Sequence, residues 1–172
     1  HDQFSVGVSA STSRGGPLQI GHSNIFRRLG LGRFKDILME VTRDPAMLIY
    51  LDNYINGRPR GGRPTINENY GRELLELYTM GEGNGYSQAD VIEASKCLSG
   101  WSLTGRNTFL YRSNYHVTGN KTVLGTQIRS AGQAEVSALL DVILAHAAPA
   151  RYTGGKLFAY FVAENAPTAL LD

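Results

Sequence analysis

Six polar or charged residues crowd one short stretch of the sequence that has helical spacing. They lie between positions 67 and 76 and are Asn67, Glu68, Asn69, Arg72, Glu73 and Glu76. At 100° per residue, Asn69, Glu73 and Glu76 share a strip beside the apolar face of such a helix. Two neighbouring carboxylates with an amide can hold a hard cation or act as a general acid and base. The pattern therefore predicts a carboxylate site, with Glu73 and Glu76 as catalytic residues and a divalent cation as the cofactor to test.

The same stretch also allows a purely structural interpretation. Glu68, Arg72 and Glu76 form an i, i+4, i+8 ladder, in which each Glu–Arg pair stabilises the helix by about 0.3–0.5 kcal/mol. A catalytic site would need a further group from elsewhere, and the candidates are Asp52, Asn53, Asn56, Asp90 and His116. An enzyme should bring the carboxylates together with His116 in a cleft. If the carboxylates are an internal bracket, they should pair with Arg72 or with backbone amides.

His116 and Lys121 are the second candidate pair. They flank Gly119-Asn120, which separates two β-prone runs and predicts the turn of a hairpin. Imidazole titrates near neutral pH, so His116 beside Lys121 could bind an anion or position a proton. Alternatively, His116 hydrogen-bonds neighbouring backbone. The sequence contains no His-Glu-x-x-His, Gly-x-Ser-x-Gly or Walker motif, so the common zinc protease, serine hydrolase and NTPase interpretations lack support.

Residues 56–64 read NGRPRGGRP and must form an exposed loop, because three glycines and two prolines interrupt regular structure. This loop is either a solvated connection or an anion-binding loop that uses Arg58, Arg60 and Arg63. Trp101 follows a helix-ending Gly100 and is expected in the core or in a pocket wall.

Helix signals surround these candidates. Asp44-Pro45 predicts an N-cap followed by proline at the first helical position. Thr65 with Glu68, and Ser87 with Asp90, have the spacing of capping boxes, while Gly81 and Gly100 are placed to end the helices that follow. An earlier helix is expected from about Ser23, after a polar loop at 9–17.

The C-terminal third changes pattern twice. Phe109 and Tyr111 alternate with polar neighbours and predict a strand, whereas helical periodicity returns at Val136 and again at Leu157, after the pair Gly154-Gly155. We therefore expect a mainly α fold, an irregular bundle of about six helices with a small β hairpin inserted near residues 107–124.

Length and composition narrow the class of protein. The 172 residues fit a single domain, and 42% hydrophobic with 19% charged residues is typical of a globular chain. The net charge is only +2, so a nucleic-acid-binding surface is not expected. No apolar run is long enough to span a membrane. The single Cys97 excludes an intrachain disulfide and is expected to be a buried thiol.

Several ordered blocks of the sequence resemble a known bacterial family, the domain of unknown function 1800. They are Asp44-Pro-Ala-Met-Leu-Ile-Tyr-Leu-Asp-Asn53, Asn67-Glu-Asn-Tyr-Gly-Arg-Glu-Leu-Leu-Glu-Leu77, Gly85-Tyr-Ser-Gln-Ala-Asp-Val91 and Leu98-Ser-Gly-Trp101. Further on, His116, Gly119, Lys121, Leu124 and Gly125 match the family's His-Asp-x-Gly-x-Lys-x-x-Leu-Gly block. Ala150-Arg151, Lys156-Leu157 and Phe161-Val162 match its final helix. The resemblance extends from Phe34 to Pro167.

The resemblance implies where the protein acts and with which partner, but it does not imply a reaction. Members look mostly helical, often carry export signals, and are frequently encoded beside a second uncharacterised family related to sulfatases. Members are also longer, and a His-x-x-Phe segment from their middle resembles His1-Asp-Gln-Phe4. The chain is therefore expected to be the middle-to-C-terminal part of a larger domain, without its N-terminal helices, and to expose an apolar face where those helices would pack.

Three positions depart from the family pattern. Val117 replaces the aspartate after the histidine, so a His-Asp pair cannot be transferred to His116. Tyr78 stands where many members have histidine, which weakens a metal-ligand interpretation of that position. Gly71 replaces a small residue at a helix penalty of about 1 kcal/mol relative to alanine, which indicates close packing.

Three functions remain open at this point. The first is a non-catalytic protein, periplasmic or extracellular, that acts with a partner from the neighbouring sulfatase-related family. The second is an exported hydrolase-like enzyme whose site combines Glu73, Glu76 and His116 and binds a divalent cation. In either case Asn67, Glu68, Asn69, Arg72, Asp90, Trp101 and Lys121 are the candidate binding residues. The third is an anion-binding module built on the arginine loop.

Overall fold

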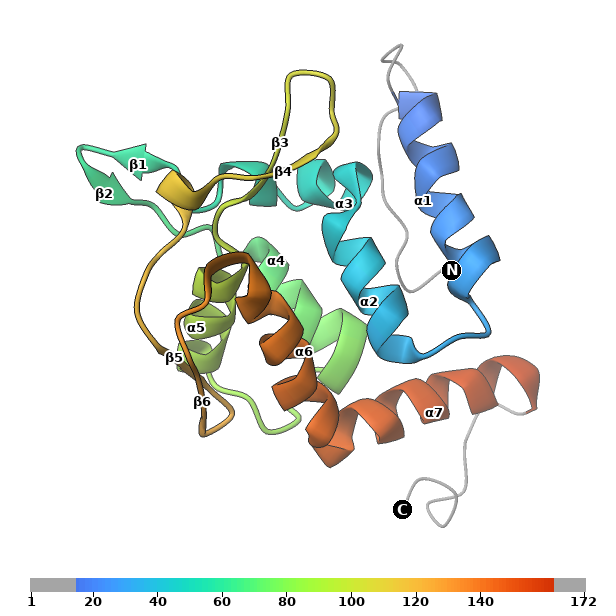
Figure 1. Ribbon diagram of the computed structural model, residues 1–172. Coiled ribbons are helices and arrows are strands. Elements are labelled where there is room, and N and C mark those ends of the chain that lie inside the picture. Colours follow the sequence, from blue (N-terminus) through green and yellow to red (C-terminus); the bar gives the residue numbers. More distant parts are fainter. Residues whose placement is uncertain (1–14, 163–172) are drawn as a thin grey trace.

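The computed structural model describes residues 15–162, which form seven α-helices and three two-stranded antiparallel sheets (Figure 1). The α-helices are α1 (Gly15–Leu29), α2 (Phe34–Arg43), α3 (Pro45–Tyr50), α4 (Asn69–Glu73), α5 (Gln88–Leu98), α6 (Glu135–Ala145) and α7 (Ala147–Phe161). The strands are β1 (Pro59–Arg60), β2 (Arg63–Pro64), β3 (Trp101–Leu103), β4 (Phe109–Tyr111), β5 (Lys121–Val123) and β6 (Thr126–Ile128). The expected mainly α fold with a small β insertion is confirmed.

Four further helical segments lie between these elements. Three of them are 3₁₀ turns, η2 (Asn53–Ile55), η4 (Ser113–Tyr115) and η5 (Gly132–Ala134). The fourth, η3 (Leu74–Met80), is a π-helix that continues α4. Inside it, the Thr79 hydroxyl donates to the Leu74 carbonyl, five residues back, at 2.6 Å. The π-helix ends at Gly81, whose φ of 83° confirms the predicted glycine stop.

Two of the three predicted helix caps are confirmed. Asp44 accepts a hydrogen bond from the Ala46 amide ahead of Pro45, and Ser87 forms a reciprocal capping box with Asp90. The capping box predicted at Thr65 is wrong. Its backbone pairs with Arg58 in a hairpin, and α4 begins only at Asn69, whose amide is capped by the Asn67 side chain at 3.0 Å.

Both ends of the described chain are more helical than the sequence indicates. Helix α1 begins at Gly15 instead of near Ser23, and Pro17 lies in its first turn, where its missing N–H costs nothing. Helix α7 runs through Gly154-Gly155, which were expected to separate two helices. Each glycine weakens a helix by only about 1 kcal/mol relative to alanine. The predicted loop residues 9–14 and the His1–Phe4 segment lie outside the described residues.

The hairpin near residue 120 is present, but its turn is five residues later than predicted. Strands β5 and β6 pair Val123 with Thr126, so Leu124 and Gly125 form the two-residue turn. Their φ angles of 50° and 74° are those that a tight hairpin turn requires. The predicted strand at Phe109 and Tyr111 is β4, which pairs with β3.

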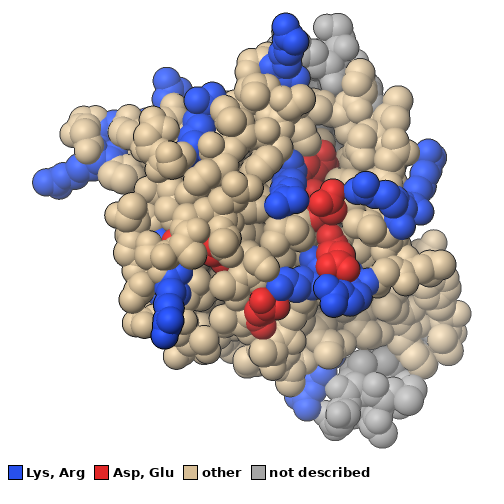
Figure 2. Space-filling view, in the orientation of Figure 1, with Lys and Arg blue, Asp and Glu red and all other residues tan. Residues whose placement is uncertain are grey.

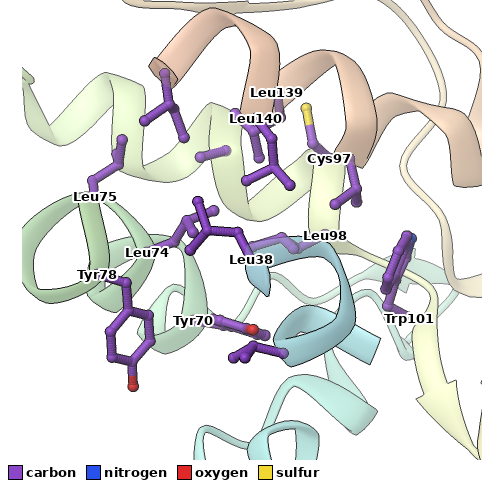
Figure 3. Close-up of a cluster of buried hydrophobic side chains, with 14 of the residues drawn as sticks. Leu38, Tyr70, Leu74, Leu75, Tyr78, Cys97, Leu98, Trp101, Leu139 and Leu140 are labelled. Atoms are coloured by element: carbon purple, nitrogen blue, oxygen red, sulfur yellow. The ribbon is translucent and has the colours of Figure 1, made fainter. Parts of the chain in front are cut away.

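One continuous core joins the helices. Its largest fully buried members include Leu38 of α2, Tyr70 of α4, Leu98 of α5 and Leu139 of α6. These side chains meet between α2, α5 and α6, with α4 and its π-helix closing one side (Figure 3). Cys97 lies in the same cluster and is fully buried, as predicted.

Two features lie at the edge of the helical bundle. One is a polar contact between α1 and α3, and the other is the exposed apolar end of α7. His22 of α1 contacts Asp44, with 2.5 Å between Nδ1 and Oδ2, so α1 is tied to the start of α3. At the other end, Leu157, Tyr160 and Phe161 of α7 are exposed. The apolar face expected where N-terminal helices would pack, and the place of this chain within a larger domain, stay predictions. Within residues 15–162, no helix has the length and apolar character needed to span a membrane.

Candidate functional site

The densest buried charge in the described part of the chain lies around Glu135, the first residue of α6. Its Oε1 is 3.0 Å from His116 Nε2, and its Oε2 is 2.7 Å from Lys121 Nζ. The exposed fractions are 7% for His116, 1% for Lys121 and 0% for Glu135. The structure thus brings His116 and Lys121 together, as predicted, but around a glutamate that the sequence analysis missed.

Backbone groups complete this buried cluster. The amides of Ala131 and Gly132 donate to Glu135 Oε1 at 2.9 and 3.1 Å. On the other side of the imidazole, His116 Nδ1 lies 2.9 Å from the Ser99 carbonyl oxygen. The Lys121 ammonium also donates to the Val117 carbonyl at 2.5 Å. The cluster therefore joins the end of α5, the hairpin β5–β6 and the start of α6.

The electrostatics of Glu135 follow from these contacts. Burial on its own raises the pKa of this carboxyl group, because it disfavours the charged form. The hydrogen bonds from Lys121, the Ala131 amide and His116 outweigh burial and hold the pKa below its ordinary value. The carboxylate also contributes, after burial, to raising the pKa of the Cys97 thiol to about 12. Cys97 is therefore protonated near neutral pH and is a poor nucleophile.

Glu73 and Glu76 lie on a different element and share no hydrogen bond or ion pair with His116. Glu73 ends α4, and Glu76 lies in the π-helix, where its Oε2 accepts a hydrogen bond from the Tyr86 hydroxyl at 3.3 Å. The Glu73 Oε2 atom is buried without a hydrogen-bond partner among the described residues. Burial first, and then the charge of Glu76, raises the pKa of the Glu73 carboxyl group.

The remaining polar residues of the α4 stretch connect elements. Glu68 Oε2 accepts from Arg72 Nη2 at 3.2 Å and from Gln88 Nε2 at 2.6 Å, which links α4 to α5. The Asn67 amide donates to Asn56 Oδ1 at 3.0 Å. Glu68 thus makes the contact with Arg72 that an internal bracket predicts, whereas Glu76 binds the Tyr86 hydroxyl and Glu73 Oε2 has no partner among the described residues. The Asn69 side chain is exposed, and its backbone amide donates to the Asn67 side chain at the start of α4.

Asp90 and Trp101 also serve the scaffold. Besides capping α5, Asp90 accepts a hydrogen bond from the Leu124 amide at 2.6 Å, and so holds the β5–β6 turn against the helix. Trp101 is 1% exposed and packs against Phe109 with 5.0 Å between ring centroids. The core position, one of the two expected for Trp101, is the one observed.

In the described part of the chain, no three His, Cys, Asp or Glu side chains gather closely enough to hold a metal ion. Glu73 and Glu76 therefore lack a third ligand of these types. Asp52, one of the candidate further groups, is exposed, and its backbone carbonyl oxygen accepts a hydrogen bond from the Asn67 side chain at 3.3 Å.

The arginine loop has regular structure and borders a groove. Strands β1 and β2 pair Pro59 with Pro64 and Arg60 with Arg63. Between this hairpin and the start of α4 lies a groove of about 740 Å³, with Arg58 and Arg60 among the residues that line it. The structure thus provides an open, cationic surface at the loop that the sequence analysis named as a possible anion-binding element.

Comparison with known proteins identifies one family. The model of the family described as "Protein of unknown function (DUF1800)" matches residues 1–172, the whole chain. No curated protein matches the chain significantly, and no solved structure does. The match agrees with the resemblance found in the ordered blocks from Asp44 to Val162. The chain therefore belongs to the DUF1800 family of proteins of unknown function.

Proposed function

We propose that this protein is a non-catalytic binding component of the bacterial cell envelope, which acts with a partner protein. The observation that carries the proposal is the use of the predicted catalytic histidine inside the protein. His116 lies between Glu135 Oε1 and the Ser99 carbonyl oxygen and is 7% exposed. A general base must reach a proton of the substrate. An imidazole enclosed in this way is suited to holding the fold.

The other candidate residues support the same conclusion. Glu68 pairs with Arg72 and Gln88, Asp90 caps α5 and holds the β5–β6 turn, and Lys121 is 1% exposed beside Glu135. Each of these side chains fixes one element against another. Glu68, Asp90 and Lys121 thus belong to a scaffold, and a scaffold of this kind is suited to presenting surfaces to another protein.

The location and the partner in this proposal come from the family resemblance. Members often carry export signals, which favours a periplasmic or extracellular protein. They are frequently encoded beside a sulfatase-related protein of unknown function, and this neighbour is the partner that we propose.

The experiment is a direct binding measurement. The chain and the neighbouring sulfatase-related protein are purified separately, then mixed and analysed by size-exclusion chromatography and titration calorimetry, with and without a chelator. We expect a complex with a Kd in the micromolar range or tighter, about −8 kcal/mol or more favourable, and no effect of the chelator. Absence of a complex at protein concentrations of about 100 µM would contradict the proposed partner.

One observation favours the hydrolase as a second candidate. The Glu73 Oε2 atom is buried without a hydrogen bond among the described residues, and its pKa is raised, as in a general acid. The discriminating variants are Glu73→Gln and, as a control, Glu82→Gln, which is exposed in the following loop. Hydrolysis of ester or phosphate substrates that Glu73→Gln abolishes and Glu82→Gln retains would replace the binding proposal with the enzyme.

A further inference from the structure

The β1–β2 hairpin concentrates positive charge that the protein itself does not neutralise. Arg58, Arg60 and Arg63 are all exposed, and residues 53–67 contain no Asp or Glu. Among the described residues, none of the three guanidinium groups takes part in an ion pair. The hairpin projects from the body of the molecule in Figure 1, and basic side chains extend from the same edge in Figure 2.

The hairpin is held by backbone hydrogen bonds in spite of its loop-like composition. The Gly57 amide donates to the Thr65 carbonyl at 2.9 Å, and the Thr65 amide donates to the Arg58 carbonyl at 3.3 Å. Gly61 and Gly62, with φ of 58° and 80°, form the tight two-residue turn. The arginines are therefore presented from a paired ribbon instead of a flexible loop.

Two buried asparagines fasten the base of this ribbon to α5. Asn56 Nδ2 donates to the Ser95 carbonyl at 2.8 Å, while its Oδ1 accepts from the Asn67 amide. Asn53 Nδ2 donates to the carbonyls of Leu98 and Trp101 at 3.2 and 3.0 Å. A prearranged surface loses less conformational entropy when a partner binds, which favours affinity.

The groove beside the hairpin has the chemistry of a peptide site. The groove is lined by Ile55, Pro59 and Ile66 as well as by Arg58 and Arg60. Glu68 also borders it, but this carboxylate is bound by Arg72 and Gln88. Guanidinium groups bind carboxylates through paired hydrogen bonds, and apolar side chains can pack on the isoleucines and the proline. Nucleic acid would call for a wider basic surface than a chain of net charge +2 is expected to have.

We propose that the groove beside the β1–β2 hairpin binds an extended, acidic segment of a partner protein, with Arg58, Arg60 and Arg63 recognising its carboxylates. This inference rests on the proposed partner-binding function and names the surface and the chemistry. The hairpin arginines supply the charge recognition, and the groove beside them receives apolar side chains of the segment.

The test uses a fluorescein-labelled peptide of about ten residues that alternates Glu and Val, with a Gln–Val peptide as its neutral counterpart. Fluorescence anisotropy compares the chain with Arg58→Gln/Arg60→Gln/Arg63→Gln. The control is Arg27→Gln/Arg106→Gln/Arg129→Gln, which loses the same charge from exposed positions elsewhere. We expect the hairpin variant to bind at least about tenfold more weakly, the control within about twofold, and the Gln–Val peptide poorly throughout. Circular dichroism verifies that both variants fold.

Three results would overturn the proposal. These are unchanged binding by the hairpin variant, an equal loss in the control, or tighter binding of a single-stranded oligonucleotide or inorganic phosphate than of the acidic peptide. The sulfatase-related partner separates this inference from the proposed function. If the hairpin variant binds that partner as well as the unaltered chain does, the groove is wrong and the function stands. If that partner fails to bind while the peptide binds through the arginines, the groove stands and the partner is wrong.

Discussion

Glu135 is a buried carboxylate that contacts the His116 imidazole, the Lys121 ammonium and two backbone donors. Taking these charges out of water is costly, and the mutual contacts offset that cost only while every partner is present. Removing one partner should therefore have a much larger effect than removing an exposed ion pair. The Lys121 ammonium is the group left uncompensated, since its side chain is 1% exposed.

Replacing Glu135 with Gln is expected to lower the free energy of unfolding by about 3–5 kcal/mol, because the amide cannot balance the buried Lys121 charge. The matched control is Glu40→Gln, which removes the carboxylate that pairs with Arg28 and Arg43 at the surface. That loss should be about 0–1 kcal/mol. Urea denaturation followed by circular dichroism measures both, and equal losses in the two variants would show that the buried cluster has no special weight.

At this scale the sequence allowed two of the three side chains of the cluster to be predicted. His116 and Lys121 were recognised because they lie five residues apart in one motif. Glu135 lies nineteen residues beyond His116, in another element, so only the tertiary structure brings it near. The available signal was an acidic residue at the start of a helix whose other residues are mostly apolar. Glu73 and Glu76 were grouped with His116 by residue type alone, and no local rule could show that their elements do not bring them together.

Helices α4 and α5 meet at Gly71, and the closeness of that contact explains the glycine. An added Cβ at position 71 would overlap the Ser95 side chain and lie 2.9 Å from the Val91 carbonyl oxygen. Gly154, in the middle of α7, has no atom within 4 Å of an added Cβ. Both glycines thus lie in helices, but packing requires a glycine only at position 71.

This difference predicts opposite effects of the same substitution. Gly71→Ala should destabilise the protein by about 1–3 kcal/mol, because overpacking at the α4–α5 contact outweighs the better helix propensity of alanine. Gly154→Ala should stabilise it by up to about 1 kcal/mol, because alanine gains propensity and meets no neighbour. Thermal unfolding of the two variants side by side provides the comparison. A stabilised Gly71→Ala protein would mean that the helices can separate without cost.

Features that depend on adjacent residues in the sequence were predicted well, whereas features that depend on tertiary contacts were not. The caps at Asp44 and Ser87 depend on a few adjacent residues and were predicted correctly. The β5–β6 turn was misplaced because Leu124 adopts a positive φ that leucine disfavours, while its amide is held by Asp90 from α5. The same holds for Thr65, which was expected to cap a helix but pairs across the arginine hairpin.

Across the whole molecule, a few polar side chains connect the packed elements. Asn53 and Asn56 tie the arginine hairpin to α5, Asp90 ties α5 to the β5–β6 turn, and Glu135 ties α6 to that hairpin. Two of these joints are carboxylates whose pKa is lowered in the folded protein. For Asp90, hydrogen bonds from Ser87 and the Leu124 amide outweigh the opposing effect of burial. The stability of the fold should therefore depend on pH through these two joints.

The direction of this dependence follows from linkage. A carboxyl group with a lowered pKa contributes its full stability above its ordinary pKa, which is 4.5 for Glu135 and 3.8 for Asp90. That contribution is lost as the pH falls through the lower, folded-state values. Glu73 works in the opposite sense, because its pKa is raised by burial and by Glu76, so its protonation on mild acidification favours the folded state.

We therefore expect the free energy of unfolding to hold or rise slightly as the pH falls from about 7 to about 4.5, and to decline steeply below that. Urea denaturation across the range measures it for the unaltered chain, for Glu135→Gln and for Glu73→Gln. The Glu135 variant, although less stable at neutral pH, should lose less stability in acid, because it has one carboxylate fewer to protonate. The Glu73 variant should lack the mild rise above about pH 4.5 and keep the steep decline. If Glu135→Gln declines as steeply as the unaltered chain, acid unfolding begins elsewhere, and the Glu135 cluster is not the joint that fails first.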